Sequence, residues 1–149
     1  MTKIIFEQIG NIITTILLLL SLNELLPDKS SHSGIIFINI GFYTFLFIIW
    51  LILFLFLRIL YSYWDKNYEL KRGEYSASDE REINISQRSS TIAYKCCISY
   101  LIIATVIYLF INNIYSISEG ITLLLILGSI IILSFFTYLL AWIYFYLKT

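Results

Sequence analysis

Four polar residues near the start of the sequence are spaced so that they would lie on one face of an α-helix. Glu7 is followed by Asn11, then by Thr14 and Thr15, and Lys3 stands one turn before Glu7. An ionisable residue at membrane depth is by default a candidate functional group, because a charge is costly there. The alternative is structural: Glu7 lies only about one turn inside its apolar segment, near Lys3, where water can hydrate both charges.

A second group of candidates is charged and lies in the middle of the chain: Asp79, Glu80, Arg81, Glu82 and Arg88. Asp79 can start a helix by accepting a hydrogen bond from the third backbone N–H while Glu82 reaches back, a variant of the capping box. Acidic residues in a first turn also favour the positive end of the helix dipole. We expect this group to be a surface for a protein partner, since little else lies outside the apolar segments.

The patterns that enzymes and metal sites require are missing from the sequence. The single histidine, His32, has no suitable pair of cysteines, because Cys96 and Cys97 are adjacent. There is no His-Glu-x-x-His, no Gly-x-Ser-x-Gly and no phosphate-binding glycine loop. Gly128 is expected to let helices approach closely. We therefore predict no enzyme, no metal and no cofactor.

The composition indicates that membrane helices position these residues. Of 149 residues, 59% are hydrophobic and only 13% are charged, against about 25% charged in a soluble domain. A net charge of zero gives no basic excess for nucleic acid, so none is expected as a partner.

Long uncharged runs mark the spans, because a helix needs about 20 apolar residues to cross a bilayer. We predict an all-α integral membrane four-helix bundle that forms one domain over residues 1–149. Its spans are placed at about 4–22, 35–60, 92–111 and 121–147. A β-barrel is disfavoured because residues 45–57 are apolar at every position instead of alternating. The first segment has a signal peptide as its alternative, opposed by Glu7, Gln8 and Asn11 within it.

Basic residues predict the orientation. With the N-terminus in the cytoplasm, nine basic residues lie inside: Lys3, Arg58, Lys66, Lys71, Arg72, Arg81, Arg88, Lys95 and Lys148. Only Lys29 lies outside. This positive-inside asymmetry predicts a multi-pass protein of a prokaryotic cytoplasmic (inner) membrane with both termini in the cytoplasm.

The connection between the second and third spans, residues 61–91, is predicted to be a cytoplasmic helical hairpin. The second helix can continue through Tyr68 to Arg72, with Gly73 after its end. The other arm begins at Asp79 and continues unbroken into the third span.

The run Asp79-Glu80-Arg81-Glu82, with Ile83, Ile85, Arg88, Ser90, Ile92 and Ala93 leading into a span, resembles a box in a known group of proteins. These are small prokaryotic four-span membrane proteins of uncharacterised function, in which the box precedes the third helix on the cytoplasmic side. The resemblance covers about fifteen residues plus the hydropathy layout. It implies a fold and a compartment, and no activity.

These observations favour a non-enzymatic accessory, immunity or regulatory membrane protein that acts through its cytoplasmic hairpin. An oligomeric pore or membrane-perturbing effector, of holin-like or abortive-infection type, is the alternative, with copies arranged around the Glu7-Asn11-Thr14 face. A small transporter is a second alternative, and needs a substrate-binding charge near mid-membrane. The expected partners are the lipid bilayer, a cytoplasmic or membrane protein, and further copies of the chain.

Overall fold

A computed structural model describes residues 2–25, 41–65, 68, 79–114 and 119–148. They form four helices: α1 (Thr2–Leu25), α2 (Phe42–Trp64), α3 (Glu80–Ile114) and α4 (Glu119–Lys148). Each is long and apolar enough to cross a membrane. A chain this apolar adopts helices because each helix satisfies its own backbone hydrogen bonds where no water can do so. The predicted all-α, four-span fold is confirmed.

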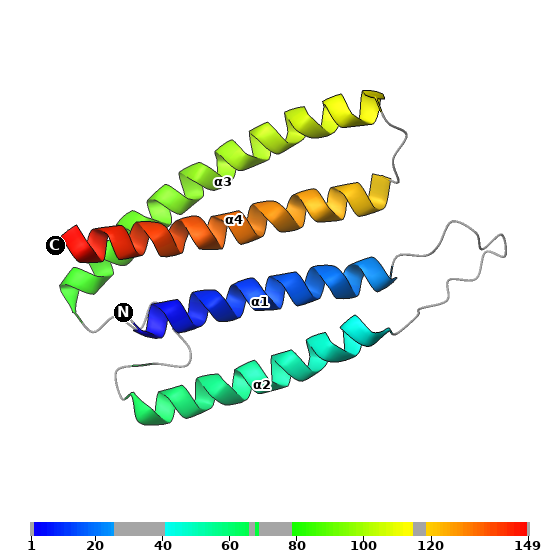
Figure 1. Cartoon of the computed structure of the whole chain (residues 1–149). Helices are drawn as coiled ribbons and strands as arrows, with labels where there is room; N and C mark the ends of the chain where they lie inside the picture. The colour runs from blue at the N-terminus through cyan, green and yellow to red at the C-terminus, as the bar shows by residue number, and fades with distance from the viewer. Residues whose placement is uncertain (1, 26–40, 66–67, 69–78, 115–118, 149) are drawn as a thin grey trace.

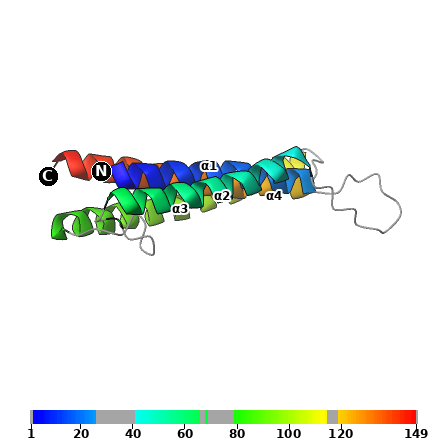
Figure 2. The ribbon, with the colours of Figure 1, turned by 90° about the horizontal axis from the view of Figure 1, so that it is seen from below.

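The four helices lie side by side in the order α2, α1, α4, α3 (Figure 1). The extensive contacts in the described chain join α1 to α2, α1 to α4, and α3 to α4. Viewed at right angles, the helices form a shallow layer (Figure 2). Helices α1 and α4 are therefore central and α2 forms one edge. Helix α3 forms the other edge over most of its length, but its start crosses α4 and contacts α1 (Figure 1).

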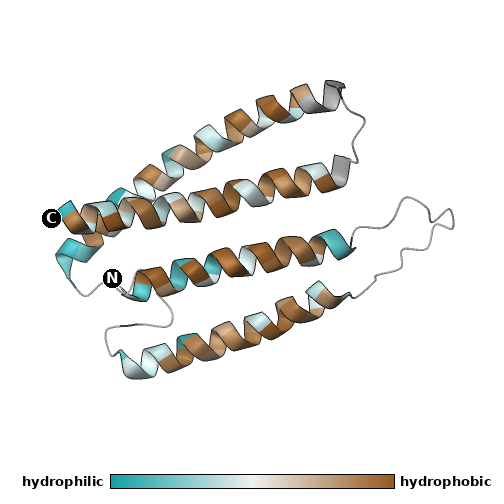
Figure 3. Cartoon of the chain, in the orientation of Figure 1, coloured by the Kyte–Doolittle hydropathy of each residue, from teal (hydrophilic) through white to brown (hydrophobic). Residues whose placement is uncertain are grey.

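Both ends of the chain lie at the same end of the layer, as an even number of spans requires (Figure 1). Hydrophilic residues concentrate there, and apolar residues cover most of the helix surface beyond it (Figure 3). The buried apolar cluster is at this end too, where Ile4, Ile85, Tyr138 and Trp142 join α1, α3 and α4. The Trp142 ring is fully buried. We call this region the charged end of the layer.

Two glycines allow helices to approach closely. A Cβ atom on Gly10 would meet the Phe54 ring of α2, and one on Gly128 would meet the Leu19 side chain of α1. The absence of a side chain therefore lets α1 pack against both neighbours. The predicted packing role of Gly128 is confirmed.

Helix α2 ends earlier than predicted. The Asp65 N–H still donates to the Tyr61 carbonyl, but the backbone of Asp65 is extended, so the helix ends at Trp64. Continuation through Tyr68 is therefore wrong. A helix rising about 1.5 Å per residue would carry Tyr68 some 15 Å beyond Arg58, yet the two side chains are hydrogen-bonded. The predicted end at Arg72 and Gly73, and the predicted start of the second span at Ile35, lie outside the described residues.

Helix α3 confirms one prediction and corrects another. It runs unbroken from Glu80 to Ile114 and joins the charged segment to the third span. Asp79 caps it, but the carboxylate accepts from the second helical N–H, that of Arg81, at 3.3 Å. Glu82 is turned away to Lys3 of α1, so the predicted capping box does not form. The start of α3 packs against α1 and α4 rather than against a helical continuation of α2.

Candidate functional site

The polar stripe predicted on α1 faces α2. Thr14 accepts a hydrogen bond from the Trp50 indole N–H at 2.9 Å and donates its own proton to the Gly10 carbonyl. One heptad further along α1, the Ser21 hydroxyl donates to Thr44 at 3.1 Å. The stripe is therefore a polar seam between two helices of one chain.

The remaining stripe residues, Asn11 and Thr15, are hydrogen-bonded to each other within α1. Asn11 is half-buried, and its backbone carbonyl accepts a hydrogen bond from the Thr15 hydroxyl at 2.8 Å. Thr15 is buried. Bonding a hydroxyl to the preceding turn satisfies its donor inside an apolar environment, so these residues fit a structural role.

Glu7 is the centre of a three-residue charge cluster at the charged end. Its side chain is 5% exposed, and its Oε1 atom accepts from the Arg58 guanidinium Nε at 2.9 Å. Tyr68 donates its hydroxyl proton to the same oxygen. The Arg58 Nε atom also lies 3.1 Å from the Tyr68 hydroxyl. The cluster joins α1, α2 and the segment after α2, and it neutralises a carboxylate that would be costly to bury alone.

Tyr68 is held in its neutral form. Burial of the phenol, followed by the hydrogen bond to Glu7, raises its pKa to about 12. Its side chain is 2% exposed. Only a neutral phenol can donate a hydrogen bond to a carboxylate, so the raised pKa of Tyr68 agrees with its hydrogen bond to Glu7.

A second ion pair links α1 to α3. The Lys3 ammonium lies 2.9 Å from the Glu82 carboxylate, and both side chains are largely shielded from solvent. The structure thus gives both Lys3 and Glu7 partners on other helices, where the sequence interpretation considered them beside one another on α1.

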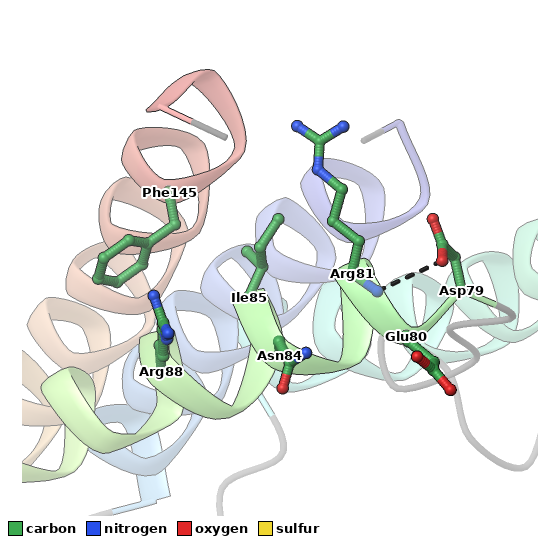
Figure 4. Close-up of a pocket in the computed structure, with 7 residues that line it drawn as sticks. All are labelled: Asp79, Glu80, Arg81, Asn84, Ile85, Arg88 and Phe145. Carbon is green, nitrogen blue, oxygen red and sulfur yellow. Dashed lines mark hydrogen bonds between the residues drawn. The ribbon is translucent and has the colours of Figure 1, made fainter.

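The charged segment at the start of α3 borders a pocket of about 470 Å³. Four of the five predicted partner residues line it, and Glu82 is the exception. The lining residues are Asp79, Glu80, Arg81, Asn84, Ile85, Arg88 and Phe145. In Figure 4, Phe145 of α4 faces Arg88 across the pocket, with Ile85 between them and the start of α3.

The pocket is lined by both basic and acidic side chains, which lie in different surroundings. Arg81 is tied to the end of α4, where its guanidinium lies 5.5 Å from the centre of the Tyr146 ring and donates to that residue's carbonyl. Arg88 is exposed, and no bond to it is found within the described part of the chain. Asp79 and Glu80 add negative charge at the other end of the pocket. Two arginines and two acidic residues beside Ile85 and Phe145 suit a partner with complementary charges.

Several contributing residues were missed from the sequence. In the sequence Arg58 stands out only as a basic residue that indicates topology, and neither Tyr68 nor Trp50 stands out at all. Arg58 did carry a signal, since a cation directly after a long uncharged run requires a partner. Nothing in the sequence pairs it with Glu7, 51 residues away. No group of metal-ligating side chains is found among the described residues.

Comparison with known families places nearly the whole chain in one of them. The sequence model of a family described as "Predicted membrane protein (DUF2178)" matches residues 2–149. Searches among curated proteins and among solved structures found no match.

Proposed function

The chain belongs to the DUF2178 family of predicted membrane proteins, and we propose that it is a non-enzymatic accessory, immunity or regulatory protein of a prokaryotic cytoplasmic membrane. In this proposal both termini lie in the cytoplasm, and the start of α3 binds a protein partner.

The observation that carries the proposal is the pocket at the charged end. Asp79, Glu80, Arg81 and Arg88 gather there around Ile85 and Phe145. An apolar floor with charged residues around it is the usual composition of a protein-binding surface, in which charges give specificity and apolar contact gives affinity.

The polar seam supports this choice over the pore and the transporter. Both of those alternatives require the Glu7 face to meet water or a substrate. Glu7 and Thr14 are instead bonded to α2 of the same chain. We therefore place the proposed activity at the pocket.

A photo-crosslinking amino acid in place of Asn84, which is exposed and lines the pocket, tests the proposal in the membrane of the native host. We expect one discrete protein adduct, identified by mass spectrometry. The same group in place of Leu125, exposed on α4, is the control and should give no such adduct.

The adduct should also depend on the charges of the pocket. Arg81→Ala combined with Arg88→Ala should reduce its yield at least fivefold, about the effect of losing 1 kcal/mol of binding free energy. Lys95→Ala, an exposed cation of α3 outside the pocket, should leave it unchanged. The proposal is wrong if Asn84 gives no discrete adduct, or if the adduct survives the double substitution.

A further inference from the structure

Three basic residues form a stripe along α3. Arg81, Arg88 and Lys95 recur every seven residues, and all three are exposed. Two residues seven positions apart on an α-helix point in directions that differ by only about 20°. The three basic side chains therefore project from the same flank of α3. The exposed positions between them on this flank, Asn84, Thr91 and Ile92, carry no charge.

Lys95, the last of the three basic residues, lies next to the membrane-spanning part of α3. Lys95 is the last charged residue of α3, and an uncharged run begins at Cys96. Tyr100, one turn further, is hydrogen-bonded to Thr137 of α4 at 2.9 Å. Thr137 lies well inside the uncharged run of α4 that ends at Leu147. Lys95 is therefore attached within the span rather than beyond it.

An exposed lysine at this depth needs an anion or water at the level of its ammonium group. Side chains on a helix point toward its N-terminus, so Lys95 extends toward Arg88 and the charged end. Long basic side chains reach the headgroup level in this way. Arg88 and Lys95 are both exposed, so the described helices do not cover this flank of α3.

From this geometry we propose that Arg88 and Lys95 bind the phosphate of an anionic phospholipid headgroup on the lipid-facing flank of α3. The charges are complementary, and no carboxylate lies between Arg88 and Lys95 along α3 to compete with the phosphate. Neither the Arg88 guanidinium nor the Lys95 ammonium has a bonded partner within the residues that the structure describes. The lipid proposal shares Arg88 with the pocket of the proposed function, but Lys95 does not line that pocket, so Lys95 separates the two proposals.

The test reconstitutes the full chain in nanodiscs with equal phosphatidylglycerol and phosphatidylcholine, and counts co-released lipids by native mass spectrometry. We expect a preference of at least threefold for phosphatidylglycerol, since one interfacial cation contributes roughly a factor of five. Lys95→Gln should lower the preference, and Lys95→Gln with Arg88→Gln should bring it close to one. Lys148→Gln, which removes an exposed cation of α4, is the matched control and should keep it.

The conservative variant Lys95→Arg separates binding from folding, because it should retain the preference at an unchanged melting temperature. Equal retention of both lipids by the wild type would overturn the proposal, as would a preference that survives the double Gln variant. Lys95→Gln should leave the Asn84 crosslink intact, so a failure here is distinguishable from a failure of the partner pocket.

Discussion

Glu7 accepts hydrogen bonds from two residues that are distant in sequence, Arg58 and Tyr68. Removing one member of such a cluster leaves the others buried without a counter-charge, whereas removing an exposed ion pair has little effect. Substitutions in this buried cluster should therefore lower the free energy of unfolding more than substitutions in an exposed ion pair.

Glu7→Ala should lower the free energy of unfolding by about 2 kcal/mol, less than for a fully buried pair because Arg58 is about one-quarter exposed. Arg58→Ala should have a similar effect. The double substitution should cost clearly less than the sum of the two, since the second removes a charge already left unpaired. Unfolding in mixed micelles measures all three, and additive effects would show that the pair is not coupled.

Tyr68→Phe isolates the phenol. It should cost about 1.5–3 kcal/mol, the value of a hydrogen bond to a charged group. The folded chain holds the phenol proton more tightly than the unfolded chain, because the pKa is raised from 10.0 to about 12. This part of the stability is complete below pH 10 and is lost as the pH rises through about 12. Wild type minus Tyr68→Phe should show that loss between pH 10 and 12, and parallel curves would contradict it.

At the scale of helices, α1 is held by a seam on one side and by apolar packing on the other. Glu7, Thr14 and Ser21 recur every seven residues and meet α2. Gly10 lies on the same side, against Phe54, while Gly128 of α4 contacts α1 at Leu19. The two glycines occupy different surroundings, which makes them a useful comparison.

Gly10→Ala should be the more damaging glycine substitution. The Phe54 ring it would strike is stacked on Trp50 and tilted against Phe6, so it has little room to move. We expect a loss of about 1–3 kcal/mol, typical of overpacking. Gly128→Ala meets only the flexible end of Leu19 and should cost less. Melting temperatures in one detergent compare the two, and equal losses would contradict this account.

The sequence predicts the helices well and their contacts poorly. Uncharged runs locate all four spans, and α4 begins and ends within two residues of its predicted bounds. Helix α2 stops before Tyr68 because that residue folds back to Glu7, a tertiary contact that local helix signals do not contain. Four of the five residues of the predicted partner surface do meet in one pocket. The pairing of Glu7 with Arg58 depends on which helices are neighbours, and hydropathy carries no information on lateral order.

At the scale of the whole molecule, the layer has two unlike ends. Both ion pairs, the buried apolar cluster and the pocket lie at the end that holds the termini. The proposed binding of a protein partner at the pocket and of anionic lipid at α3 both require this end to face the cytoplasm, where partner proteins and anionic lipids are available. Its sidedness is therefore the central claim.

Cysteine labelling of intact cells measures that sidedness most directly. In a chain carrying Cys96→Ala and Cys97→Ala, single cysteines replace exposed residues at the two ends: Asn23 at one, Asn84 and Lys148 at the other. With a membrane-impermeant maleimide, Asn23→Cys should be labelled in intact cells, and Asn84→Cys and Lys148→Cys only after permeabilisation. Labelling of Asn84→Cys or Lys148→Cys in intact cells, with Asn23→Cys protected, would contradict the account.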